Sequence, residues 1–197
     1  TVTEGSKATF ASSFRLLGNS FVLMMVLSIF LVVGVDVGFN SNSGQFLIKR
    51  FGIDQTAAES GRSLYFFGRM LGTFAGAILL TRISSGRFFM WTSVLGIICL
   101  TAIVLVKSAA LAWVLVFLIG LAVANIWPLV FSIVIGRHPD KSNEISGLVM
   151  MAISGGAVIP LLVGWVSDIS NIALGMTILI ACMVYLWAVF AYCLKKL

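Results

Sequence analysis

Two charged side chains lie deep inside long apolar stretches of the sequence. Asp36 is about fifteen residues into the first stretch, and Arg69 is about five residues from the nearer end of the second. A carboxylate there can exchange a proton, bind a polar ligand or be neutralised by a neighbouring cation. Three interpretations are therefore open: a structural Asp36–Arg69 ion pair, a titrating or ligand-binding Asp36, and an interfacial Asp36 whose side chain extends to water.

Uncharged polar and aromatic side chains lie in the same stretches. An amide both donates and accepts hydrogen bonds, so amides beside an aromatic ring suit hydroxyl groups such as those of a sugar. The predicted ligand contacts are Asn40, Asn42, Tyr65, Asn125 and Trp127. For Trp127 an ordinary packing role is equally open, and we expect a kink at the following Pro128.

The segment around Asp36 reads GVDVGFNSNSG and is rich in poor helix formers. We expect a broken helix there, which would expose backbone groups to a polar ligand as discontinuous membrane helices do. The alternative is that the apolar helix ends near Phe39 and that the remainder forms an outer cap.

The elements that must position these residues are membrane helices. Of the 197 residues 60% are hydrophobic and 10% charged, whereas soluble domains are about 45–50% apolar and about 25% charged. Each long apolar run is close to the ~20 residues that a helix needs to cross a bilayer, and the ~10-residue alternating strands of a membrane barrel are absent. We predict an all-α integral membrane fold with six transmembrane helices, at about 21–39 (or to 48), 64–80, 88–106, 109–135, 145–166 and 172–194.

The basic residues predict how the chain is oriented. Eight Lys and Arg fall on the side of the two termini and four on the other, so the positive-inside rule places both termini in the cytoplasm. The larger group comprises Lys7, Arg15, Arg82, Arg87, Arg137, Lys141, Lys195 and Lys196, and the smaller one Lys49, Arg50, Arg62 and Lys107. The net charge of +6 thus reflects topology, and no basic stripe indicates nucleic-acid binding.

A faint internal repeat divides the chain. A shift of 86 residues aligns Gly34 with Gly120, Asp54 with Asp140 and Ser60-Gly61 with Ser146-Gly147. Each repeat, about 21–107 and 108–197, holds three spans, so the second must be inverted relative to the first. The first two spans of each repeat are polar and the third is not, which favours four helices around a pathway and two facing lipid.

Small residues at helical spacing predict close helix packing. Gly68, Gly72 and Gly76 form a stripe on the second span, and Gly155, Gly156 and Pro160 lie in the fifth. The three cysteines fall in apolar runs and are expected to be small buried residues. The sequence contains no nucleophile–base pair, zinc-ligand spacing or phosphate loop, so we predict neither an enzyme nor a metal or cofactor site.

Several blocks resemble a known family. GVDVGFNSNSGQFL, LYFFGRMLGTFAGAILLTRI, IWPLVFSIVIG and above all ISGLVMMAISGGAVIPLLVGWVSD resemble the second six-helix half of a major facilitator superfamily transporter. They are most similar to the fucose/glucose/galactose–proton symporter group. Asp36 stands where that group usually carries a glutamate, and Asn125 where a smaller hydroxyl residue is usual.

The resemblance implies a twelve-helix protein of two bundles in the cytoplasmic (inner) membrane, with a central sugar site, alternating access and the proton as coupling ion. The partner would be an N-terminal six-helix half, to which residues 1–20 form a cytoplasmic linker and residues 21–197 the second bundle. Asp36 and Arg69 would then be a coupling or gating pair. The alternatives are transport of another small polar solute and a non-transporting membrane sensor or scaffold derived from such a transporter.

Overall fold

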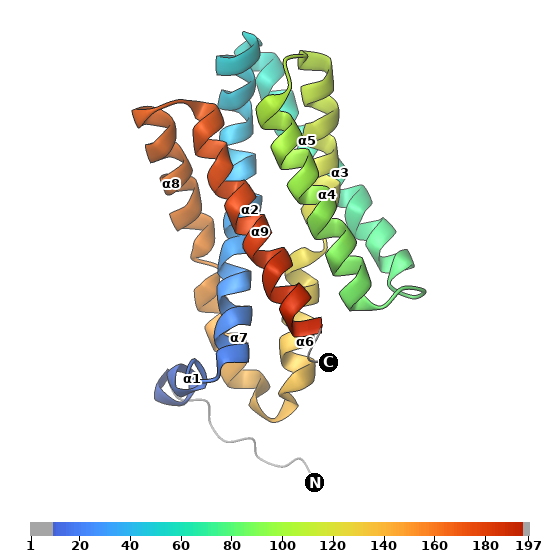
Figure 1. The fold of residues 1–197 in the computed structure, drawn as a ribbon, viewed down its shortest axis with the longest axis vertical. Coiled ribbons are helices and arrows are strands. Elements are labelled where there is room, and N and C mark those ends of the chain that lie inside the picture. The colour runs from blue at the N-terminus through green and yellow to red at the C-terminus, as the bar shows by residue number, and fades with distance from the viewer. Residues whose placement is uncertain (1–9, 195–197) are drawn as a thin grey trace.

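The structure, a computed structural model, describes residues 10–194, and nearly all of them are helical (Figure 1). The all-α prediction is confirmed. In chain order the helices are α1 (Phe10–Leu16), α2 (Ser20–Phe51), α3 (Gln55–Leu79), α4 (Ser85–Leu105), α5 (Ala109–Val123), α6 (Ile126–Arg137), the 3-10 helix η1 (Pro139–Lys141), α7 (Ser142–Ala152), α8 (Gly155–Ile169) and α9 (Ile172–Leu194). Residues 1–9 of the predicted linker over 1–20 lie outside the described residues, and α1 forms much of the rest of the linker.

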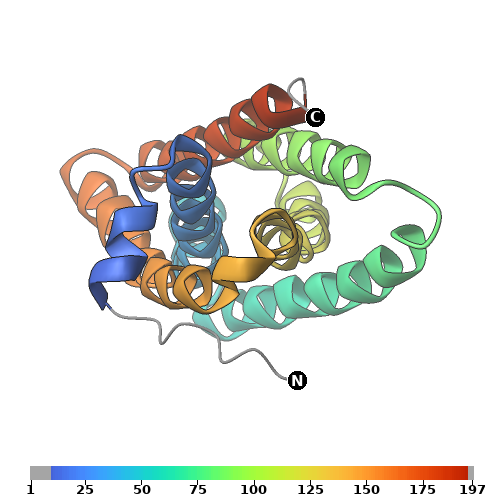
Figure 2. The same cartoon turned by 90° about the horizontal axis from the view of Figure 1, so that it is seen from below.

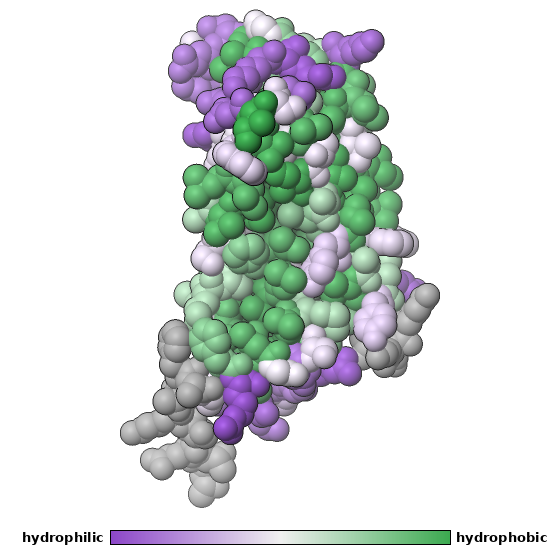
Figure 3. Space-filling view, turned by 60° about the vertical axis from the view of Figure 1, so that its left-hand side comes forward, coloured by the Kyte–Doolittle hydropathy of each residue, from purple (hydrophilic) through white to green (hydrophobic). Residues whose placement is uncertain are grey.

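Five helical stretches in the described part are long and apolar enough to cross a membrane. They are Ser20–Phe51, Ser85–Leu105, Ala109–Arg137, Pro139–Ile169 and Ile172–Cys193. Helix α3 has 25 residues, so its length is sufficient, but Arg62 and Arg69 make it more polar than the others. Hydrophilic side chains gather at the upper end of the bundle, and in smaller number at its lower end, on either side of a broad hydrophobic belt (Figure 3).

Helix α2 runs without interruption for 32 residues, so the predicted broken helix is wrong, and so is the alternative that the helix ends near Phe39. The polar side chains bond back to their own helix: Asn42 Nδ2 donates to the Gly38 carbonyl (2.9 Å) and Ser43 Oγ to that of Asn40 (3.1 Å). Burial of apolar residues beyond this point, Phe46 among them, holds the last turns in the bundle. The helix ends at Gly52, whose φ of 64° is left-handed.

Two other passes through the bundle are interrupted. Helix α5 ends at Val123 and α6 begins at Ile126, with Pro128 in the first turn of α6, where its missing N–H is tolerated. The helix is therefore interrupted at Ala124–Asn125, a few residues before Pro128, the position of the predicted kink. A second interruption separates α7 from α8, where the Ser154 N–H donates to the Met151 carbonyl (3.1 Å) in place of a regular α-helical bond.

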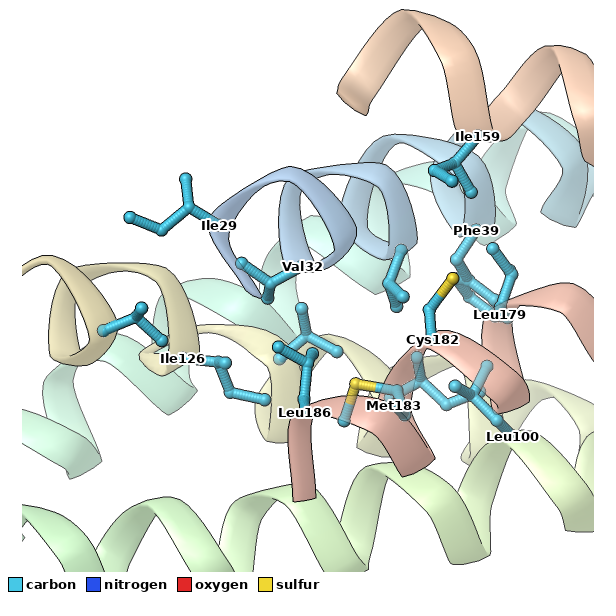
Figure 4. Close-up of a cluster of buried hydrophobic side chains, with 14 of the residues drawn as sticks. Ile29, Val32, Phe39, Leu100, Ile126, Ile159, Leu179, Cys182, Met183 and Leu186 are labelled. Atoms are coloured by element: carbon cyan, nitrogen blue, oxygen red, sulfur yellow. The ribbon is translucent and has the colours of Figure 1, made fainter. Parts of the chain in front are cut away.

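Seen along its length, the bundle places α2 and the α5–α6 pass at its centre (Figure 2). Helices α4 and α9 lie together on one side, and α3 and α7 on the other. The core joins α2 to α9, with contributions from α4, α6 and α8 (Figure 4). All three cysteines are buried in helices, as predicted.

Glycines permit the closest helix approaches. On α3, a Cβ at Gly68 would lie 2.2 Å from the Phe117 carbonyl oxygen of α5, and one at Gly72 would lie 2.5 Å from that of Leu121. On α8, a Cβ at Gly155 would lie 1.9 Å from the Phe30 carbonyl oxygen of α2. The other members of the predicted packing set lie at the same two interfaces: Gly76 against Asn125, Gly156 against Val33 and Val37, and Pro160 beside Gly38.

Candidate functional site

The charged pair suggested by the sequence is formed. Arg69 Nη1 on α3 donates to Asp36 Oδ2 on α2. The Tyr65 hydroxyl, also on α3, donates to Asp36 Oδ1. Both carboxylate oxygens are therefore engaged, and the Asp36 side chain is only 16% exposed against 36% for Arg69.

Helix α3 brings its two donors to the same carboxylate because they are four residues apart. Residues at i and i+4 lie on one face of a helix, so Tyr65 and Arg69 meet α2 together. The Tyr65 ring is fully buried and lies 5.4 Å, centroid to centroid, from the ring of Phe39. Close glycine packing of α3 on α5 fixes the position of this face.

A cavity of about 180 Å³ lies beside the ion pair. Its lining comes from four passes through the bundle: α2, α3, the α5–α6 pass and the α7–α8 pass. These are the four spans predicted to be polar. The lining residues are Val32, Val33, Asp36, Arg69, Val123, Trp127 and Ile153. The cavity is thus a mainly apolar space with one charged pair and one indole at its wall, which is the usual make-up of a small-molecule site.

Trp127 contributes an unused hydrogen-bond donor. Its ring is stacked on Phe131, with the centroids 5.5 Å apart, so it has a packing role. Its Nε1 atom is buried and has no hydrogen-bond partner among the described residues. A buried donor without an acceptor costs about 1–3 kcal/mol, which a bound hydroxyl would offset.

The three predicted asparagine contacts do not line this cavity. Asn125 is buried, and its Nδ2 donates to the Gly72 carbonyl of α3 (2.6 Å), so it connects the α5–α6 interruption to α3. Asn40 lies one turn beyond Asp36 on α2, and the Asn42 amide is bonded to its own helix. Tyr65 also lies behind the carboxylate, where it positions Asp36.

Sequence reasoning did not find the apolar wall. Val32, Val33, Val123 and Ile153 line the cavity, yet nothing separates them in the sequence from the other aliphatic residues of their helices. The Tyr65–Asp36 bond had a usable signal, because the i,i+4 spacing of Tyr65 and Arg69 already placed both on one face. Among the described residues no group of three or more His, Cys, Asp or Glu could hold a metal ion.

The bundle with its central charged pair has the fold of one half of a major facilitator superfamily transporter. A crystal structure of the transporter FucP of this superfamily, in the outward conformation, matches 98% of the chain with a TM-score of 0.87 at 17% identity. A variant of the E. coli fucose:proton symporter FucP matches 96% of the chain with the same TM-score at 18% identity. The chain covers 47% of either structure, so it is about half the length of those proteins.

Sequence comparison finds sugar transporters among the relatives. A glucose/galactose transporter of Brucella abortus biovar 1 (strain 9-941) is 28% identical over 167 residues, which are 84% of this chain and 40% of that transporter. The matched part is its C-terminal region. The resemblance to a C-terminal half of a superfamily sugar symporter is therefore confirmed, although no family model matches the sequence. These relatives are transporters and not enzymes, in agreement with the prediction.

Proposed function

We propose that the chain is the C-terminal half of a proton-coupled sugar transporter. It would act with an N-terminal six-helix half by alternating access and carry a hexose or 6-deoxyhexose such as glucose, galactose or fucose. The names of the relatives support a sugar as the substrate. The observation that carries the proposal is the cavity that the Asp36–Arg69 pair and Trp127 line together.

The proposal includes the arrangement in the membrane. Helix α3 would also cross the membrane, which brings the number of spans to six. Both termini would lie in the cytoplasm, and the membrane would be the inner one. The unequal numbers of basic residues at the two ends of the bundle support this orientation. Helices α2–α4 and α5–α9 would be the two inverted repeats.

Asp36 is the proposed link between proton and sugar. Protonation removes its negative charge and with it the ion pair to Arg69, so proton binding would weaken the contact between α2 and α3. The released guanidinium would then be a donor for sugar hydroxyls, together with the Trp127 N–H. Asn40, Asn42 and Asn125 remain proposed contacts in the site that the two halves complete.

Sugar uptake tests the proposal directly. The full-length protein would be reconstituted into proteoliposomes, and uptake of radiolabelled glucose, galactose and fucose measured with and without an imposed pH gradient. We expect gradient-dependent uptake of at least one sugar, and loss of the gradient dependence in Asp36→Asn. Asp54→Asn is the matched control, because Asp54 is an exposed helix cap and Asn caps helices equally well.

Two outcomes would contradict the proposal. Absence of uptake for all three sugars would favour another small polar solute or a non-transporting sensor or scaffold. An unchanged rate and pH profile in Asp36→Asn would remove Asp36 from the coupling.

A further inference from the structure

A second and larger cavity, of about 400 Å³, lies at the end of the bundle far from the ion pair of the central site. It is formed where α2 ends and where the link from α8 to α9 passes. Its lining residues are Lys49, Arg50, Ser167, Ser170, Asn171, Ile172 and Ala173. Its volume lies within the ~300–1,000 Å³ of ordinary ligand sites.

The charge in this cavity is of one sign. Lys49 and Arg50 are exposed, and neither forms an ion pair within residues 10–194. The acidic residues at the same end are Asp54, Glu59 and Asp168, and none of them lines the cavity. The Asp54 carboxylate caps α3 by accepting the Ala57 N–H (3.2 Å).

The uncharged lining adds further donors. Asn171 Oδ1 accepts the Leu174 N–H (2.9 Å), so its amide NH₂ remains to face a ligand. The Ser170 hydroxyl has no hydrogen bond among the described residues, whereas the buried Ser167 hydroxyl already donates to the Val163 carbonyl (2.6 Å). Two cations, an amide and a hydroxyl together match a ligand rich in acceptor oxygens, such as a phosphate diester.

The position of the cavity selects the source of that phosphate. The end of the bundle at which α2 ends and α8 passes to α9 is the upper one in Figures 1 and 3; it is hydrophilic and lies directly beyond the hydrophobic belt, at the level expected for lipid headgroups. Ile172 and Ala173 begin the apolar helix α9 and line the cavity next to its polar residues. A lipid can fill such a place with its headgroup while its chains follow the apolar helices.

We propose that this cavity binds the phosphate headgroup of an anionic phospholipid, with Lys49 and Arg50 as the main contacts. The positive-inside rule predicts few basic residues on the side opposite the two termini, and a lipid phosphate site gives a reason for the presence of Lys49 and Arg50 there. The inference requires that the bundle crosses a membrane, and it does not depend on which solute is transported.

Lipid binding to the full-length protein in a nonionic detergent tests the inference. Phosphatidylglycerol and the zwitterionic phosphatidylcholine would be titrated and the bound lipid counted by native mass spectrometry. At about 1 kcal/mol per basic residue, Lys49→Gln with Arg50→Gln should weaken phosphatidylglycerol binding roughly 30-fold. The matched control is Arg62→Gln with Lys107→Gln, which removes the same charge at the same end but outside the cavity.

We expect phosphatidylglycerol to bind more tightly than phosphatidylcholine and the control variant to change its affinity less than about threefold. The swap Lys49→Arg with Arg50→Lys keeps the charge and should keep the lipid, which separates binding from misfolding. Equal affinity for the two lipids, or equal losses in the two charge-removing variants, would overturn the site. Displacement of the lipid by millimolar glycerol phosphate would overturn the lipid assignment in favour of a soluble anion.

Discussion

Two helix pairs in the bundle approach each other through glycine, α3 with α5 and α2 with α8. A Cβ on Gly120 of α5 would lie 2.2 Å from the Tyr65 carbonyl oxygen, and one on Gly34 of α2 would lie 2.2 Å from Ile159 Cγ1. The predicted repeat relates these contacts: Gly34 and Gly120 are 86 residues apart, and so are Arg69 and Gly155.

The two pairs differ in what lies beside the glycines. On the α3 side, Asp36, Tyr65 and Arg69 form a charged cluster at the cavity. A shift of 86 residues replaces these with Ala122, Met151 and Gly155, so the α8 side carries no charge there. Glycine packing is therefore enough to join two helices, and the charged cluster is an addition that links one pair to the other, with Asp36 on α2 and its two donors on α3.

The largest predicted effect is on packing, and it should be shared by both pairs. Gly155→Ala and Gly68→Ala each place a Cβ within 2.2 Å of a backbone oxygen, so we expect losses of about 3 kcal/mol in stability and much less monodisperse protein. Thermal unfolding in detergent measures the effect. Gly164→Ala is the control, since a Cβ there meets no atom within 4 Å. Equal melting temperatures for all three variants would show that these close glycine contacts do not set the stability of the bundle.

The next effect should occur only at the charged contact between α2 and α3. Arg69→Gln leaves the Asp36 carboxylate without its cation, and we expect about 2 kcal/mol of lost stability, less than for a fully buried pair because Arg69 is partly exposed. Sugar uptake should fall with it. Adding Asp36→Asn should restore the melting temperature but not uptake; restored uptake would show the pair to be purely structural.

Removal of the Tyr65 hydroxyl should have a smaller effect. Tyr65→Phe keeps the buried ring but loses its hydrogen bond to a carboxylate, which is worth about 1.5 kcal/mol. Unfolding measurements with Tyr185→Phe as control would show it, because the Tyr185 side chain is only partly buried and donates no hydrogen bond in the described structure. A change of equal size in the two variants would remove Tyr65 from the charged cluster.

The smallest effect concerns the indole at the cavity wall. Trp127→Phe keeps an aromatic ring on Phe131 and removes the unused N–H, so stability should change little. If that donor binds a sugar hydroxyl, KM for uptake should rise about three- to tenfold, with kcat nearly unchanged. Trp165→Phe on the exposed side of α8 is the control. An unaltered KM would leave Trp127 with packing alone.

Much of the fold was predictable because lipid imposes a length and a composition on each helix. The charged pair was also foreseeable, since Asp36 and Arg69 lie at comparable depth in neighbouring helices. Local propensity failed for α2: the Gly-, Asn- and Ser-rich segment stays helical because its side chains bond to their own backbone and its neighbours are buried. The role of Asn125 was not predictable either, because its partner is a backbone carbonyl 53 residues away.

The continuity of α2 has a mechanical consequence for the central cavity. One wall of this cavity is an unbroken helix, whereas the facing walls contain the interruptions at Ala124–Asn125 and Ile153–Ser154. Bending concentrates where the regular hydrogen-bond ladder is already missing. The space beside Asp36 therefore has one continuous wall and two walls that contain a joint, so it can change its width while α2 stays unbroken.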